Sequence, residues 1–408
     1  MRNAVVGMVV GLVVGVVLGV TFIAPRLKAS LPAAAQEALA AKPQPVPAKS
    51  PPLVIESASA APETPKAAPA VPAAPPQESL LPPEKPRPPV VRWRMESAFA
   101  ARLPQLGSQA KRIETETWRI SDGAMEIKFH EPGSLVRDPE MIAAVKSGTL
   151  DAAFVAPDAW PAHVPALQLF GAIPFGPKAE EYLAWLYFGG GEKLLQEIAQ
   201  DLGVQILVCG LISPEGSGWF RRPIKTVDDL KGLKLRMTGL GARVMSRLGA
   251  ETVTLAEGDI FHAMETGAID AAEYSMPAID ATLGLHRMAR NYYFPGWHQP
   301  TTLLGLVINR ARWEALPPVQ RSQLRAVCGD NVRHGLAEGE ALQYRALLNL
   351  TKEGVAVRRW PKEILDSLEK AWLQVAHQEA KADKGFAKVW KSLNDFRKDY
   401  AVWRDLGR

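Results

Sequence analysis

The chain of 408 residues contains few of the side chains from which catalytic or metal centres are usually built. Its 7 histidines are dispersed and do not form the spacing of a zinc site. The sequence has no Gly-x-Ser-x-Gly elbow, no Walker loop, no His-Glu-x-x-His and no Cys-x-x-Cys pair. The stretch TGLGARVMSRLG has one Gly-x-Gly but lacks the third glycine of the dinucleotide pattern. These absences predict a protein that is not an enzyme.

Cysteine and unbalanced charge are also scarce. The 2 cysteines are Cys209, which ends the apolar run QILVC, and Cys328, which lies in a helical stretch. We expect two buried free thiols rather than a bridge, and so small a number does not decide the redox compartment. The net charge is +5, but both signs are scattered along the chain. Because no basic patch with interleaved aromatic residues stands out, the sequence argues against a nucleic-acid partner.

Residues 1–28 are predicted to be an N-terminal transmembrane anchor or signal segment. Positions 4–25 are uncharged and mostly Val, Leu and Gly, which is about the length that crosses a bilayer as a helix. Glycines at every fourth position would let two such helices approach closely in lipid: Gly7, Gly11, Gly15 and Gly19. The alternative is a cleaved export signal, with residues 33–35 (AAA) as the cleavage region. We favour the anchor.

A linker is expected at 29–90, because Pro, Ala, Ser and Lys dominate it and cannot bury enough apolar surface to fold. The body at 91–408 alternates strands and helices, which predicts an α/β fold of two lobes with mainly parallel strand pairing. We place the first lobe at about 91–212 and the second at about 213–300, followed by a returning strand and C-terminal helices. The expected strands lie at 90–95, 125–131, 204–210, 233–237, 251–256 and 301–310.

The body contains two segments of closely similar sequence, AAVKSGTLDAAFVAP at 143–157 and HAMETGAIDAAEYSMP at 262–277. Each reads as a helix, a glycine stop, an apolar residue and a short strand, and Asp151 matches Asp270. Ligands of open α/β sheets bind at the carboxyl ends of strands. Two equivalent edges therefore suggest two lobes that face each other across a ligand cleft. The alternative is coincidence, because helix–glycine–strand units are common in α/β folds.

Arg236 is the sharpest candidate for a binding residue. It lies near the end of the apolar strand LKLRM, where an unpaired charge would be costly. A guanidinium offers a planar, two-pronged donor for a carboxylate, and the helix that starts beside it adds free N–H groups. The alternative is a structural salt bridge within the lobe.

Glu273 lies on the equivalent strand end and Glu215 lies in the loop SPEGSGWF. Two carboxylates together with a carboxylate ligand would suit an oxygen-ligated cation such as calcium. The alternatives are a lobe-internal partner of Arg236 for Glu273 and a solvated loop charge for Glu215. Aromatic and polar residues could line the pocket, although aromatic residues are more often simply core: Trp219, Tyr274, Trp297, His298 and Gln299.

At 221–274, the run RRPIKTVDDLKGLKLRMTGLGARVMSRLGAETVTLAEGDIFHAMETGAIDAAEY resembles the solute-binding component of tripartite ATP-independent periplasmic (TRAP) transporters, the DctP family. The run YYFPGWHQPTTLLGLVINRARWEALP at 292–317 resembles the branch that binds 2-oxoacids and hydroxyacids such as lactate. The resemblance covers essentially 91–408. It implies a two-lobed periplasmic receptor, not an enzyme, that closes over a small organic acid and delivers it to a membrane permease.

The resemblance also implies site residues. Arg236 matches the arginine that clamps the ligand carboxylate, and Glu273 matches the acidic position that helps to hold a sodium or calcium ion. Tyr274 falls where a backbone carbonyl joins that ion. Glu215 falls near a position where relatives carry Gln or Asn, and its extra charge would favour a divalent ion or no ion. Ala159 falls where relatives place an aromatic residue over the ligand, and the adjacent Trp160 is a further ligand-binding candidate.

The anchor and the linker depart from a freely diffusing receptor. A receptor tethered to the inner membrane gains effective concentration near its membrane partner. The expected partners are the acid, the permease subunits, the membrane through the N-terminal helix, and a second copy in a homodimer. The rival function is a membrane-anchored sensor or scaffold that uses the same lobes.

Overall fold

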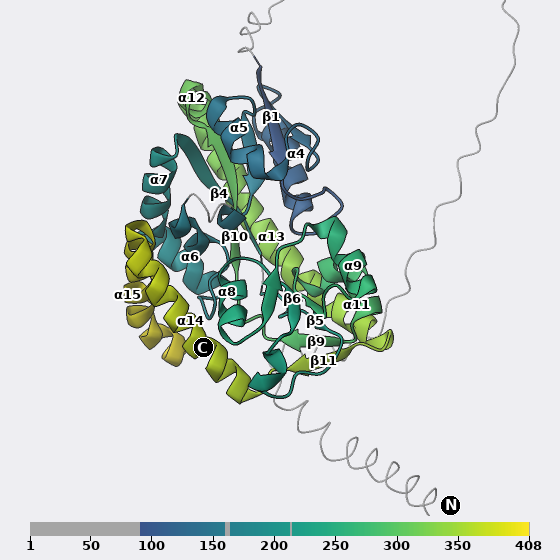
Figure 1. Cartoon of the computed structure of the whole chain (residues 1–408). Helices are drawn as coiled ribbons and strands as arrows, with labels where there is room; N and C mark the ends of the chain where they lie inside the picture. Colours follow the sequence, from purple (N-terminus) through teal and green to yellow (C-terminus); the bar gives the residue numbers. More distant parts are fainter. Residues whose placement is uncertain (1–89, 160–163, 213, 408) are drawn as a thin grey trace, which may run out of the picture. The chain divides into compact units, whose positions relative to one another are not determined.

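Two mixed β-sheets organise the part of the chain that the computed structural model describes, residues 90–407 without 160–163 and 213 (Figure 1). The first sheet has the order β2-β1-β3-β10-β4. Its strands are β1 (Val91–Ser97), β2 (Met125–His130), β3 (Ala152–Val155), β4 (Val204–Ile212) and β10 (Thr302–Asn309). β4 and β10 are buried along their whole length, which explains their continuous apolar runs.

The second sheet has the order β11-β9-β5-β8-β6-β7. Its strands are β5 (Trp219–Phe220), β6 (Lys234–Arg236), β7 (Glu251–Val253), β8 (Ala271–Ala272), β9 (Asn291–Phe294) and β11 (Ala356–Arg359). The two sheets are the centres of the two lobes, so the expected two-lobed α/β fold is confirmed.

The expected mainly parallel pairing is only partly right. β1 pairs parallel with β2 and β3, β6 pairs parallel with β7 and β8, and β11 pairs parallel with β9. β10, however, is antiparallel to both β3 and β4, and β5 is antiparallel to both β8 and β9. The chain builds most of the second lobe before β10 returns to the first sheet, and β10 therefore enters that sheet in the opposite direction.

Helices cover the sheets and join the lobes. The C-terminal helices contact both lobes: α13 packs on β4, α4 and α10, α14 packs on α8, and α15 packs on α6 and α7. In Figure 1, α14 and α15 run along one side of the molecule. The first-lobe helices are α4 (Gly107–Ile120), α5 (Met141–Ser147), α6 (Ala179–Phe188) and α7 (Gly191–Asp201). The second-lobe helices are α8 (Gly239–Arg247), α9 (Glu257–Thr266), α10 (Pro277–Leu283) and α11 (Leu285–Met288). The C-terminal helices are α12 (Arg310–Ala315), α13 (Pro318–Lys352), α14 (Lys362–Ala382) and α15 (Lys384–Gly407).

Short 3-10 turns link several of these elements. They are η2 (Asp138–Glu140), η3 (Pro157–Ala159), η4 (Pro165–Phe170) and η5 (Val227–Leu230).

The two similar segments of the sequence have the same local structure. α5 ends at Gly148 with φ 80°, and α9 ends at Gly267 with φ 76°. This left-handed conformation is one that residues with a Cβ resist. After each glycine, the next apolar residue turns back onto its own helix: Leu150 N–H donates to the carbonyl of Ala144 at 3.0 Å. Each unit then enters a strand, β3 in the first lobe and β8 in the second.

Asp151 and Asp270, which occupy equivalent positions in the two similar segments, also make equivalent hydrogen bonds. Asp151 donates its N–H to the Arg94 carbonyl at 3.2 Å, and its Oδ2 accepts the Arg94 N–H at 2.8 Å. Asp270 donates its N–H to the Lys234 carbonyl at 2.8 Å, and its Oδ2 accepts the Lys234 N–H at 3.2 Å. Each aspartate thus fixes the register between its own strand and a parallel neighbour. The two repeats therefore present equivalent carboxyl edges in the two sheets.

The expectation of free thiols is wrong. Cys209 of β4 and Cys328 of α13 form a disulfide, with an S–S distance of 2.13 Å. α13 packs across β4, and this packing brings the two cysteines together over a sequence separation of 119. The sequence shows that each cysteine has an apolar setting, but not that the two elements touch.

Nothing in the described part of the chain tests the predicted N-terminal arrangement. The predicted anchor at 1–28 lies outside the described residues, as does the linker at 29–90 apart from its last position. Among the described residues, no helix combines the length and the apolarity needed to span a membrane.

Candidate functional site

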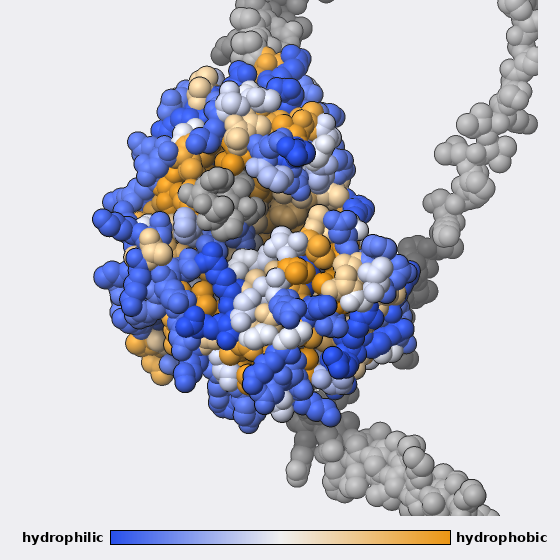
Figure 2. Space-filling view, viewed as in Figure 1, coloured by the Kyte–Doolittle hydropathy of each residue, from blue (hydrophilic) through white to orange (hydrophobic). Residues whose placement is uncertain are grey.

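A cavity of about 160 Å³ is lined by both lobes. Figure 2 shows the surface hollowed on the face between the part that contains β1 and the part that contains β6. The carboxyl ends of β3, β4, β6 and β8 supply or precede much of the lining, as expected for an α/β binding site. The lining residues are Phe99, Leu106, Ala156, Asp158, Ile212, Glu215, Arg236, Thr238, Glu273, Tyr274, Ser275, Gln299, Thr302 and Leu304.

Arg236 is the last residue of β6 and lines the cavity from the second lobe. Its Nη1 donates to the backbone carbonyl of Glu273 at 2.5 Å and lies 3.5 Å from Glu273 Oε2. Its Nε donates to the Leu255 carbonyl at 3.4 Å, and its guanidinium lies 5.3 Å from the ring centre of Tyr274. Among the described residues, no hydrogen-bond partner is found for Nη2. The second lobe therefore orients the guanidinium and leaves donor capacity at the cavity.

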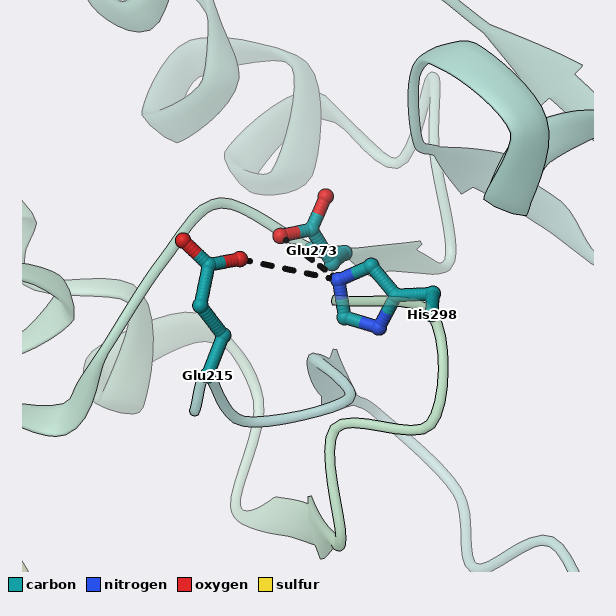
Figure 3. A group of neighbouring side chains, drawn as sticks. All are labelled: Glu215, Glu273 and His298. Carbon is teal, nitrogen blue, oxygen red and sulfur yellow. Dashed lines mark ion pairs between the residues drawn. The ribbon is translucent and has the colours of Figure 1, made fainter. Parts of the chain in front are cut away.

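Glu215, Glu273 and His298 form a buried cluster at this cavity (Figure 3). His298 Nε2 lies 3.6 Å from Glu215 Oε2 and 3.3 Å from Glu273 Oε1, so it faces both carboxylates. The hydroxyl of Ser275 donates to Glu215 Oε1 at 3.0 Å. Glu273 directly follows β8, whereas Glu215 and His298 come from the loops before β5 and after β9. Three separate segments of chain thus converge on one point.

The charges of this cluster depend on one another. Burial raises the pKa of Glu215 to about 8, and the negative charge of Glu273 adds to the rise. Burial also opposes ionisation of Glu273, but the charges of His298 and Arg236 hold the pKa of Glu273 below its usual range. Burial disfavours the charged imidazole, yet the charges of the two glutamates raise the pKa of His298 to about 9. Near neutral pH, Arg236 and His298 are then positive, Glu273 is negative and Glu215 is neutral, so these four groups together carry one net positive charge.

The cluster also fits a hard cation. Glu215 Oε2 and Glu273 Oε1 are buried and make no hydrogen bond within the described part of the chain. One ligand atom from each of Glu215, Glu273 and His298 lies within 4.8 Å of the others. Carboxylate oxygens are the ligands that calcium prefers, and an ion would compensate two buried carboxylates. The donor set therefore suits an oxygen-ligated cation.

Two of the predicted ligand-binding aromatic residues pack away from the cavity lining. Trp219 donates its indole N–H to Asp280 at 2.8 Å and stacks on Tyr292 with a centroid distance of 3.9 Å. Trp297 stacks on Phe175 at 5.6 Å. The structure thus places Trp219 and Trp297 in the core behind the site, where they support its walls.

The other predicted site residues differ in position. Tyr274 and Gln299 line the cavity, as Arg236 does. The hydroxyl of Tyr274 donates to Glu257 Oε2 at 2.8 Å, which anchors the ring beside Arg236. Trp160 lies outside the described residues.

Sequence reasoning missed two features of the site. It treated His298 only as a pocket residue, and no sequence pattern indicates that this loop histidine faces two carboxylates. It did not consider Asp158, which follows the strand of the first repeat and lines the cavity. The repeat already placed the end of that strand at a ligand-binding edge, so the same argument could have identified Asp158.

Comparison with known proteins agrees with this architecture. Residues 97–383 match the family described as bacterial extracellular solute-binding protein, family 7 (DctP). A monocarboxylate 2-oxoacid-binding periplasmic protein of Nostoc sp. is 34% identical over 318 residues, which cover 77% of this chain and 86% of that protein.

Two solved structures show the same fold. A TRAP transporter solute-binding protein from Bordetella bronchiseptica, with copurified calcium and picolinate, has a TM-score of 0.75 and 32% identity over 77% of this chain and 94% of that one. A TRAP periplasmic solute-binding protein from Pseudoalteromonas atlantica, with bound sodium and pyruvate, has a TM-score of 0.73 and 27% identity over 77% and 96%. The resemblance read in the sequence is thereby confirmed: the chain belongs to family 7 of the bacterial extracellular solute-binding proteins, the extracytoplasmic receptors of TRAP transporters.

Proposed function

We propose that this receptor binds a small 2-oxoacid, hydroxyacid or related carboxylate in the cavity between its lobes and delivers it to a TRAP permease. One observation carries the proposal: an oriented arginine and a buried pair of glutamates line the same small cavity. The names of the relatives support the ligand class, since they bind 2-oxoacids, pyruvate and picolinate.

Arg236 is the proposed contact for the ligand carboxylate. Its Nε and Nη1 are held by backbone carbonyls of the same lobe, so little side-chain entropy is lost when an anion binds. A guanidinium can hold a carboxylate through two parallel hydrogen bonds. Binding would favour the closed arrangement of the lobes only as far as the ligand prefers that arrangement.

Glu215, Glu273 and the backbone carbonyl of Tyr274 are the proposed cation ligands. A bound cation supplies positive charge between the two carboxylates and the ligand. With both glutamates ionised, the carboxylates at the cavity, including that of Asp158, carry three negative charges. Arg236 and His298 carry two positive charges, which leaves a sum of one negative charge. Calcium would therefore leave one positive charge for a monocarboxylate, whereas sodium would leave none. This charge count favours calcium over sodium. The preference arises from the negative charge of Glu215, which lies near a position where relatives carry a neutral amide.

The proposed location is the periplasm, tethered to the inner membrane by residues 1–28 and the linker at 29–90. The apolar length of the segment supports the tether, and an exported chain with a cleaved signal is the alternative. Mass spectrometry of the mature N-terminus separates the two. We also propose a homodimer, which light scattering of the purified protein tests.

The test of the proposed function is the thermal midpoint of the full chain with a panel of 2-oxoacids, hydroxyacids and dicarboxylates, each with calcium, sodium or a chelator. A ligand that binds only the folded state raises the midpoint by mass action. We expect a rise with a short monocarboxylate that depends on calcium. A rise in the midpoint that chelator does not change would contradict the proposed cation. No rise with any acid would favour the sensor or scaffold function.

A matched pair of variants sharpens the test. Glu215→Gln restores a neutral amide, and we expect it to weaken the calcium dependence and to strengthen binding in sodium. Glu140→Gln removes an exposed carboxylate of the first lobe, which pairs with Arg137, and should leave the cation preference unchanged. Equal calcium dependence in wild type and Glu215→Gln would contradict the proposed cation site.

A further inference from the structure

Three carboxyl groups line the cavity, and the described part of the chain supplies charged partners for two of them. Glu273 faces Arg236 and His298, and Glu215 faces His298. The third is Asp158, for which no ion pair is found within the described part of the chain. Among the described residues, a cavity that receives an anion therefore contains a carboxylate with no ion pair to offset it.

The backbone fixes the position of Asp158. It lies in η3, directly after β3, and the nearby backbone N–H groups of Asp158 and Ala172 favour its charged form and oppose the rise in its pKa. A Cβ at Gly171 would lie 2.3 Å from Asp158 Cγ, closer than any real contact, so the glycine leaves room for this side chain. The carboxyl group is thus held in place by the first lobe.

The surroundings of Asp158 make its charge costly. Phe99 and Leu106, also from the first lobe, line the same cavity, and burial raises the pKa of Asp158 to about 6. At neutral pH the group is still largely ionised, and a half-buried carboxylate that has lost part of its hydration is unfavourable unless it accepts hydrogen bonds. An ionised carboxylate has about four lone-pair sites, more than the nearby backbone N–H groups can fill. The remaining sites are available to a donor inside the cavity.

We propose that Asp158 determines specificity by accepting a hydrogen bond from a hydroxyl group on the ligand, at the end remote from the ligand carboxylate. This inference rests on the proposed function. Arg236 belongs to the second lobe and Asp158 to the first, so a ligand that engages both connects the lobes. The ligand class is then a short 2-oxoacid or hydroxyacid with a distal hydroxyl, and the unsubstituted acid is the weaker ligand.

The direction of discrimination follows from the chemistry. A binding site built to hydrogen-bond a hydroxyl rejects the analogue that lacks it, because its own buried polar group is left unpaired. Hydrogen bonds to charged groups are stronger than those between neutral groups. We therefore expect a preference of about tenfold or more for the hydroxylated acid.

The test is calorimetric titration of the full chain, in calcium, with 2-oxobutyrate and with 4-hydroxy-2-oxobutyrate. Wild type should bind the hydroxylated acid about tenfold more tightly. Asp158→Ala should abolish this preference while binding 2-oxobutyrate at least as well as wild type does. Asp158→Asn keeps the shape and a neutral acceptor, and should retain part of the preference. Asp201→Asn, an exposed aspartate at the end of α7, is the control and should change neither affinity.

The outcomes separate the two proposals. If wild type binds both acids equally, or if the preference survives in Asp158→Ala, the role of Asp158 is refuted while the receptor function stands. If Asp158→Ala does not fold, Asp158→Asn decides, and an undiminished preference in that variant refutes the role. If wild type binds neither these nor any other acid of the panel, the proposed function fails together with this inference.

Discussion

Removal of the disulfide between Cys209 and Cys328 should destabilise the folded protein substantially. The cross-link closes a loop over a sequence separation of 119. Loop-closure entropy for that length corresponds to about 5 kcal/mol at 25 °C, which the reduced unfolded chain regains. Both cysteines are buried, so their replacement by alanine also loses a small amount of packing.

The expected shift in thermal midpoint follows from the size of the body. Unfolding entropy of about 2.1 cal/mol/K per residue over residues 91–408 gives about 0.7 kcal/mol/K. A loss of about 5 kcal/mol then lowers the midpoint by about 7 °C. The assay is thermal unfolding of wild type and of the Cys209→Ala, Cys328→Ala double variant, each with and without reductant.

Reductant should lower the wild-type midpoint toward that of the double variant and leave the variant unchanged. A double variant within about 2 °C of wild type would refute the reasoning, because a loop of this length cannot then be constrained by the bond. A disulfide also agrees with an extracytoplasmic receptor, since such bonds persist in oxidising compartments such as the periplasm.

Three further predictions concern the site and its support. Folding raises the pKa of Glu215 from 4.5 to about 8. The stability that this group contributes is therefore full below pH 4.5 and is lost as pH rises through about 8. In chelator, the thermal midpoint of Glu215→Gln should fall less between about pH 5 and pH 9 than that of wild type. Asp280 accepts hydrogen bonds from an indole, a phenol and a backbone amide. Because Asp280→Ala leaves these buried donors unpaired, it should reduce the free energy of unfolding by about 3 kcal/mol or more in denaturant titration. A loss below about 1 kcal/mol would contradict a stabilising role of these hydrogen bonds. Arg102 of the first lobe forms an ion pair with Glu257 of the second at 2.5 Å, but the arginine is 63% exposed. Arg102→Ala should therefore weaken acid binding by no more than about fivefold in calorimetry. A larger loss would show that this ion pair contributes more to binding than exposed ion pairs do.

Much of the site could be predicted because it follows from local patterns. Glycine stops and matching aspartates located two equivalent strand ends, and the structure shows Asp151 and Asp270 in the same bonding pattern. A charge at the end of an apolar strand identified Arg236, and its considered partner Glu273 indeed lies 3.5 Å away. Whether Arg236 also binds a carboxylate stays a proposal.

The missed features depend on contacts between distant segments. The disulfide needs α13 to cross β4, and the antiparallel pairing of β10 needs the chain to return from the second lobe. His298 reaches the two glutamates from a loop with no periodic pattern. Propensity and periodicity describe neighbours along the chain, so they cannot indicate which of these segments meet in space.

The packing of the predicted pocket aromatic residues was not evident either. Trp219 reads as a pocket residue because it follows a glycine-containing loop, yet it is fully buried against Tyr292 and Asp280. Both residues of the two-residue strand β5 are buried, so the sequence pattern does not indicate which side chain faces the cavity. Only the pairing of β5 between β8 and β9 fixes that face.

The central claim is that Arg236 binds the carboxylate of the ligand. The most direct measurement is the affinity of wild type and Arg236→Lys for the same acid in calcium, by calorimetric titration. Lysine keeps the charge but not the planar pair of donors, so we predict a loss of about 100-fold in affinity, which corresponds to about 2.7 kcal/mol. Binding of the acid by Arg236→Lys and by Arg236→Ala as tight as that of wild type would contradict the account.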